Sequence, residues 1–99
     1  MACTPDFVQY VADQCGGAGE IKVRKMFGDY ALYADGKLFA LVCDDALYVK
    51  PTDSGRALLP AVDLRPPYPG AKPHFHIENV DDRAFLSALV RATCSALPG

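Results

Sequence analysis

An Asp-Gly pair at positions 35 and 36 separates two short apolar runs, Tyr30–Ala34 and Leu38–Cys43. Asp-Gly is a preferred sequence for the two-residue turn of a β-hairpin, because both central residues of that turn need positive φ angles. The pair therefore predicts two antiparallel strands joined by a tight turn. It directs the middle of the chain toward an antiparallel sheet.

Three further segments extend this predicted sheet. Ile21–Met26 alternates apolar with cationic residues, which indicates one buried and one solvated face. Ala46–Lys50 follows a turn at Asp44-Asp45 and stops before a proline, which cannot donate to a strand ladder. The HFHI sequence at residues 74–77 is predicted as a fifth strand.

Helical patterns surround the predicted strands. The first helix begins at Thr4, which suits an N-cap, and Gly16-Gly17 ends it because glycine adopts a left-handed C-cap. A short helix begins at Thr52 and runs toward Leu59, and the proline-rich segment after it is predicted as a loop up to Pro73. Asp81 caps the last helix, which carries a broad apolar stripe.

The order of these elements is helix, four strands, short helix, strand, helix. Short antiparallel hairpins with terminal helices predict an α+β, two-layer domain with an antiparallel sheet of about five strands. The 99 residues suit one domain over residues 1–99. We expect the helices to cover one sheet face and the other face to carry Lys22, Arg24 and some of the tyrosines.

Composition and cysteine spacing limit the cell compartments and the kinds of cysteine site that we expect for this chain. The start of the chain lacks the pattern of a signal peptide, and no apolar run could span a bilayer, so we expect a cytoplasmic protein without membrane association. The widely spaced cysteines contain no C-x-x-C pair, which argues against a zinc ribbon or a thioredoxin motif. We expect reduced thiols, with Cys15 and Cys94 buried in helices.

No catalytic or cofactor motif emerges from the sequence. Gly28, Gly36 and Gly55 do not form G-x-G-x-x-G or a phosphate loop, and we interpret them as turn glycines, with Gly28 as a break between the first two strands. Cys43 precedes Asp44-Asp45, and neighbouring carboxylates disfavour a reactive thiolate. We therefore expect no enzyme activity and no cofactor.

Cationic and aromatic residues gather in the predicted strands. They could form a platform for single-stranded nucleic acid, a solvated face whose lysines discourage aggregation, or a protein contact surface. The net charge of -2 disfavours nucleic acid, since binders of nucleic acid usually carry a basic footprint. The residues concerned are Lys22, Arg24, Lys25, Lys37, Lys50, Tyr30, Tyr33 and Tyr48.

Two histidines, His74 and His76, are spaced to project from one face of the fifth strand. Together with a third group such as a cysteine they could bind zinc or copper. No residue nearby in the sequence completes such a set, so ordinary surface or hydrogen-bonded histidines are the competing interpretation.

The combined pattern of the strand region resembles the N-terminal domain of the TfoX/Sxy competence regulators. The matching pieces, in chain order, are Met26-Phe27-Gly28, Tyr30 to Tyr33, Asp35-Gly36-Lys37, Phe39, Asp44-Asp45, Lys50, Pro66-Pro67-Tyr68 and Gly70–Pro73. The resemblance covers nearly the whole chain. It implies an α+β domain and a link to transcriptional regulation of DNA uptake. That role belongs to longer members with a helical C-terminal domain, so we expect a stand-alone N-terminal domain here.

From these observations we expect a non-enzymatic regulatory domain that acts by binding a protein, either the transcription machinery or a second copy of the chain. Nucleic-acid binding and a small metal-binding protein using His74 and His76 are the alternatives. The expected partner-binding residues combine recognition-prone side chains with the motif-rich stretch. They are Arg24, Lys25, Tyr30, Tyr33, Lys50 and Arg56.

Overall fold

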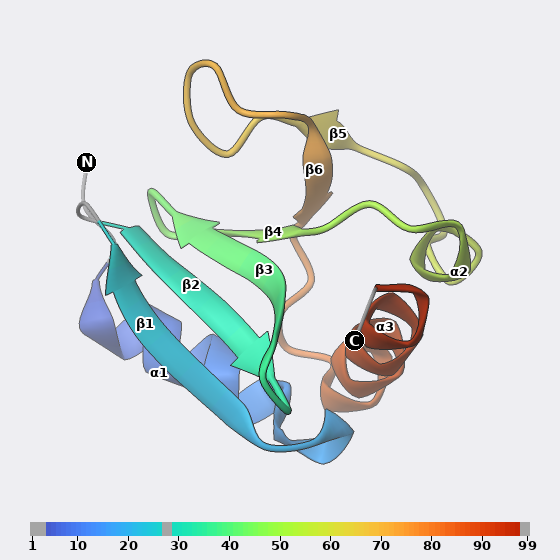
Figure 1. Ribbon diagram of the computed structural model, residues 1–99, viewed down its shortest axis with the longest axis horizontal. Helices are drawn as coiled ribbons and strands as arrows, with labels where there is room; N and C mark the ends of the chain where they lie inside the picture. The colour runs from blue at the N-terminus through green and yellow to red at the C-terminus, as the bar shows by residue number, and fades with distance from the viewer. Residues whose placement is uncertain (1–3, 27–28, 98–99) are drawn as a thin grey trace.

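The computed structural model describes residues 4–26 and 29–97. The elements in chain order are α1 (Pro5–Gln14), the 3₁₀ turn η1 (Gly16–Ala18), β1 (Ile21–Met26), β2 (Asp29–Ala34), β3 (Lys37–Cys43), β4 (Ala46–Val49), α2 (Asp53–Arg56), β5 (Leu64–Arg65), β6 (His74–Ile77) and α3 (Arg83–Ala96). Every pair of neighbouring strands is antiparallel, in the order β1-β2-β3-β4-β6-β5 (Figure 1). The predicted α+β fold is confirmed.

The sheet has six strands where the sequence predicted about five. The added strand, β5, lies inside the proline-rich segment predicted as a loop, and its two residues pair with Phe75 and His74 of β6. Two residues are too few to show a strand pattern in the sequence. Their extended conformation depends on pairing with β6, which only the tertiary structure supplies.

The predicted hairpin turn is confirmed, because Asp35 and Gly36 have φ angles of 50° and 85°. The Asp44-Asp45 turn also has positive φ at both residues, although neither is glycine. One carboxylate oxygen of Asp45 accepts a hydrogen bond from the backbone N–H of Thr4 at 2.7 Å. The predicted break at Gly28 lies outside the described residues.

The helix ends differ in detail from the predictions. Thr4 precedes α1, but its side chain bonds to Asp45 instead of capping the helix. Helix α1 ends without a left-handed glycine, because Cys15 has φ of -83° and the chain continues into η1. Asp82 caps α3 by accepting from the N–H of Phe85, while Asp81 accepts from the hydroxyl of Tyr10.

Helix α2 is shorter than predicted and ends at Arg56. Thr52 caps it by accepting a hydrogen bond from the N–H of Gly55 at 3.0 Å. Gly55 is therefore a buried helix residue and not a turn glycine. A Cβ atom at this position would lie 3.3 Å from Leu89 and from Thr93 of α3, so the missing side chain allows the two helices to pack closely.

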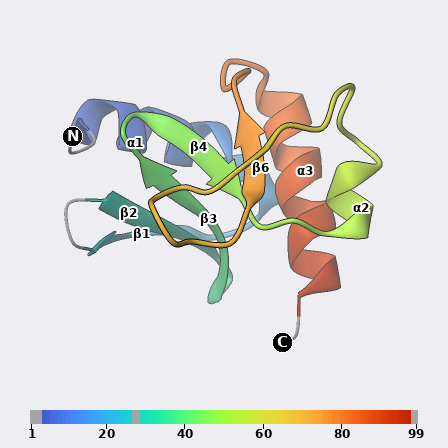
Figure 2. The same ribbon diagram turned by 90° about the horizontal axis from the view of Figure 1, so that it is seen from above.

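Helices α1 and α3 cover one face of the sheet and enclose the larger core (Figures 1 and 2). The strand residues of this core come from β2, β3, β4 and β6, and its central members are fully buried. Phe39 joins them through a bulge: Leu32 pairs with Ala40 and Tyr33 with Leu38, which leaves Phe39 as the extra residue. The bulge lets Phe39 and Ala40 both enter the helix-covered core.

Candidate functional site

The sheet face opposite the helices carries its own apolar cluster. Ala31, Leu41 and Cys43 are buried at its centre, and half-buried side chains pack around them. Cross-strand pairing of Leu41 with both Ala31 and Tyr48 places these residues on a common face. We call this set the open-face cluster; its surrounding members are Met26, Tyr33, Leu38 and Tyr48.

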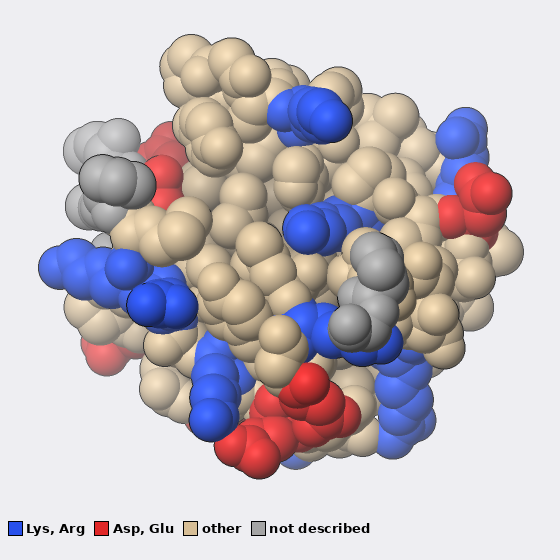
Figure 3. Space-filling view, viewed as in Figure 1, with Lys and Arg blue, Asp and Glu red and all other residues tan. Residues whose placement is uncertain are grey.

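Cations from β1 border the open-face cluster. Lys22 is paired with Tyr33, and Arg24 with Ala31, so both cations share the face of the cluster. Both are exposed, and the ammonium group of Lys22 lies 3.5 Å from a carboxylate oxygen of Glu20, which is exposed as well. Figure 3 shows an uncharged surface on this face with Lys and Arg side chains around it, and with Asp and Glu side chains at the lower edge of the view. The predicted division into a helix-covered face and a cationic, tyrosine-bearing face is therefore confirmed.

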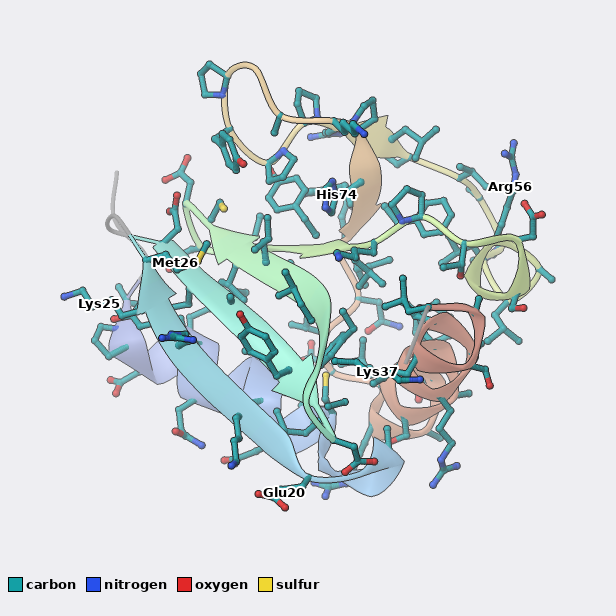
Figure 4. The ribbon with its side chains drawn as sticks, in the orientation of Figure 1. Glu20, Lys25, Met26, Lys37, Arg56 and His74 are labelled. Carbon is teal, nitrogen blue, oxygen red and sulfur yellow. The ribbon has the colours of Figure 1, made fainter. Side chains whose placement is uncertain are left out.

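A shallow groove crosses this face between β3 and the loop at residues 66–73. Its volume is about 280 Å³. Figure 4 shows Met26 and His74 on opposite sides of β3. Figure 2 shows the loop, in orange, standing at the open side of the sheet. The groove is lined by Met26, Leu38, Ala40, Leu41, Lys50, Tyr68, Ala71, Lys72 and His74.

The loop that walls the groove contributes both apolar and cationic groups. Pro67 is buried and anchors the loop, whereas the ring of Tyr68 is 51% exposed. Lys72 is exposed, and its backbone carbonyl lies 2.8 Å from Nδ1 of His74. The groove thus combines an apolar floor with an exposed aromatic ring and two ammonium groups, those of Lys72 and Lys50.

The six expected partner-binding residues do not form one site. Arg24 and Tyr33 lie on the open face and Lys50 lines its groove. Lys25 is paired with Tyr30, which packs against the helix-covered core, so these two residues belong to the other face.

Arg56, the last of the six, lies in α2. It lines a separate hollow together with Leu64 and Leu97. Figure 4 shows Lys25 and Arg56 at opposite sides of the molecule. The distance between Lys25 and Arg56 could not be read from the sequence, because it depends on how β1 and α2 are arranged in the tertiary structure.

Lys37 does not belong to the predicted cationic platform. Its ammonium group donates a hydrogen bond to the carbonyl oxygen of Cys94, in the last turn of α3, at 3.1 Å (Figure 4). A cation at this position satisfies a terminal carbonyl and complements the negative end of the helix. Lys37 therefore connects the β2–β3 hairpin to the helical layer.

The two histidines have different surroundings. His74 Nδ1 is within hydrogen-bond distance of a backbone carbonyl, whereas His76 Nδ1 lies 3.5 Å from a carboxylate oxygen of Asp63. Among residues 4–26 and 29–97, the group of three potential metal ligands is Asp63, His76 and Glu78, without His74 and without a cysteine. Glu78 follows His76 at strand spacing and could have been found in the sequence. Asp63 is distant in sequence and could not.

Cys15, Cys43 and Cys94 are the cysteines within the described ranges, and none of these three is part of a disulfide. Burial raises the pKa of the Cys15 thiol to about 12. Burial also raises the pKa of half-buried Cys94, an effect that the nearby Lys37 ammonium partly opposes. These environments favour the neutral thiol. Both residues pack against the helix-covered core, but only Cys15 is buried as the sequence predicted, and Cys94 is half-buried.

Of the helices in the described ranges, none has the length and apolar character that crossing a membrane requires.

Comparison with known proteins shows which family this sequence is similar to. The family model for the TfoX N-terminal domain matches residues 13–97, a range that includes all six strands and α3. An uncharacterised 12.7 kDa protein from the trpE 5′ region of Spirochaeta aurantia is 38% identical over 99 residues, which cover 99% of this chain and 86% of the relative. The matched range contains the open face, its groove and the motifs noted in the sequence, and the chain belongs to the TfoX N-terminal domain family.

Proposed function

We propose that this chain is a non-enzymatic regulatory domain that binds a protein partner in the groove of its open sheet face. The observation that carries this proposal is the open-face cluster itself. It is a second apolar cluster that the helices leave uncovered, although α1 and α3 already enclose a complete core. Family membership supports a competence-regulator-like domain.

The chemistry of the groove indicates the kind of segment that would bind there. Its floor is apolar, Tyr68 supplies an exposed ring, and Lys50 and Lys72 supply positive charge. Tyrosine and cationic side chains beside an apolar centre are typical of protein interfaces. A partner segment with apolar side chains flanked by Asp or Glu is complementary to this arrangement. We propose that this binding takes place in the cytoplasm.

Charge reversal on the groove rim tests the proposal. The rim variant, Lys50→Glu with Lys72→Glu, reverses the charge of the two lysines that line the groove, and Arg56→Glu, in a separate hollow, is the control. Wild type and control should capture the same protein from extracts of the native host, and the rim variant should lose it. A purified partner should then bind wild type at least about 10-fold more tightly than the rim variant, in keeping with a loss of more than 1 kcal/mol.

Two outcomes would contradict this function. Capture of nothing above background by the wild type removes its main support, and equal capture by all three proteins places the interface elsewhere. Fluorescence anisotropy with labelled single- and double-stranded DNA tests the nucleic-acid alternative. Tight DNA binding that weakens steeply with salt and is lost in the rim variant would favour it over protein binding.

Self-association is tested separately by sedimentation velocity over a range of concentrations. A dimer that forms in wild type and Arg56→Glu but not in the rim variant would identify the partner as a second copy of the chain.

A further inference from the structure

We infer that Asp63, His76 and Glu78 form a binding site for a divalent first-row transition metal ion, with Zn²⁺ as the ion that best suits these ligands. One potential ligand atom from each residue lies within 4.8 Å of the others. An imidazole nitrogen with two carboxylates suits zinc and its neighbours, whereas calcium and magnesium prefer oxygen ligands alone. None of the three ligands lines the open-face groove, although the imidazole of His76 packs against Tyr48 of the open-face cluster. The inference does not depend on the proposed protein interaction.

The imidazole of His76 provides the first reason for this inference. Its side chain is only 12% exposed, and Nδ1 is buried without a hydrogen-bond partner in the described part of the chain. The nearest carboxylate oxygen, Oδ2 of Asp63, is 3.5 Å away, which is too far for a normal hydrogen bond. A buried polar atom without a partner is unfavourable, and a metal ion between Nδ1 and the carboxylates would satisfy it.

The fold holds two of the three ligands in position. The backbone N–H of His76 donates to the carbonyl oxygen of Asp63 at 2.8 Å, which fixes the two residues opposite each other. The ring of Tyr48 packs against the imidazole with 5.3 Å between ring centroids. Ligands that are fixed before the ion arrives lose little conformational freedom when they bind it.

Arg65 supplies an outer contact that orients the Asp63 carboxylate. Its Nε donates to Oδ1 of Asp63 at 3.0 Å, while Oδ2 of the same carboxylate lies 3.5 Å from Nδ1 of His76. Metal-binding carboxylates are commonly held by such second hydrogen bonds. Nη2 of Arg65 also lies 3.0 Å from Oδ2, and this contact must lengthen when an ion takes that oxygen.

A cavity of about 460 Å³ adjoins the three ligands. Asp63, His76 and Glu78 contribute to its wall, with Asn79 and Asp82 adding further oxygen atoms. Three protein ligands leave at least one position of a tetrahedral zinc ion open. That position would face a space large enough for water or for a carboxylate from another molecule.

Equilibrium dialysis of the purified chain against Zn²⁺, with metal measured by elemental analysis, tests the site. The wild type should bind one zinc ion per chain. His76→Gln and Asp63→Asn should each weaken binding by a factor of about 100 or more, since loss of a ligand exceeds the 10- to 100-fold effect of losing an outer contact. His74→Gln is the matched control, because His74 shares the strand and lies outside the cluster. It should bind zinc as the wild type does.

A measurement on the wild type removes any dependence on how the variants fold. Addition of zinc should shift the side-chain nitrogen resonances of His76 in the NMR spectrum and leave those of His74 unchanged. The inference is overturned if the wild type takes up no zinc, or if binding requires His74 or a cysteine. It is also overturned if folded His76→Gln binds zinc with wild-type affinity.

Discussion

The two faces of the sheet differ in what covers them. On the helix-covered face, α1 and α3 bury strand residues such as Leu32 and Leu47 almost completely. On the open face, Ala31 and Leu41 are buried by neighbouring strand side chains, and Tyr33 remains half-buried beside solvent. The same strands supply both faces. The difference teaches that the helices complete only one of the two apolar clusters, while the border of the other stays in contact with solvent.

Truncation of one leucine on each face should give the largest difference in the free energy of unfolding between the two faces. Leu47→Ala removes a side chain that is 1% exposed and should lower the free energy of unfolding by about 2–5 kcal/mol, because it leaves a cavity under the helices. Leu38→Ala, in the half-buried border of the open-face cluster, should lower it by about 1 kcal/mol. Urea denaturation measures both. Equal losses would show that the open face is also part of the folding core.

Alkaline pH should act on the helix-covered face through Cys15. Its pKa is about 12 in the folded protein and near 9.0 when unfolded, so its contribution to stability is complete below pH 9 and is lost as the pH rises toward 12. The slope from one such group is about 1.4 kcal/mol per pH unit. The stability gap between wild type and Cys15→Ala should therefore narrow between pH 9 and 11.

The matched control for this alkaline effect is Cys94→Ala. Cys94 packs against the same core but is only half-buried; burial raises its pKa, and the nearby Lys37 ammonium partly opposes this rise. The difference in stability between wild type and Cys94→Ala should therefore narrow less over the same pH range. A gap between wild type and Cys15→Ala that stays constant from pH 9 to 11 would contradict the assigned role of Cys15.

Substitution of one lysine on each face should give the smallest difference in the free energy of unfolding. Lys37→Met should lower stability by about 1 kcal/mol, because the ammonium group that bonds to the Cys94 carbonyl is lost while the aliphatic stem is kept. Lys22→Met on the open face should change stability by less than about 0.5 kcal/mol, since its ion pair with Glu20 is exposed. Thermal unfolding followed by circular dichroism can compare them. A larger loss for Lys22→Met would contradict the division between the faces.

Much of the fold followed from local sequence signals. The Asp35-Gly36 turn was predictable because few residues adopt positive φ in succession, and the terminal helices were predictable from their apolar spacing. The boundaries of the helices were less predictable. Asp82 caps α3 although Asp81 was expected to, because Asp81 is engaged by Tyr10 from α1. A long-range contact decided between two adjacent, chemically identical residues.

The candidate sites were only partly predictable. Arg24 and Tyr33 were expected on an exposed face and lie there, but Lys25 and Tyr30 take the opposite face because successive residues of a strand point to opposite sides of the sheet. The sequence also linked His76 with His74. The fold instead brings Asp63 to His76 through the pairing of β5 with β6.

The sequence by itself determined the α+β class, the central hairpin and the presence of two kinds of strand face, because turn residues and alternating polarity act over a few residues. Only the tertiary structure decided which apolar face the helices cover, where the bulge places Phe39 and that Asp63 meets His76. These features arise from contacts between residues far apart in the chain. Such contacts form only when the strands pair and the helices pack, so no local pattern records them.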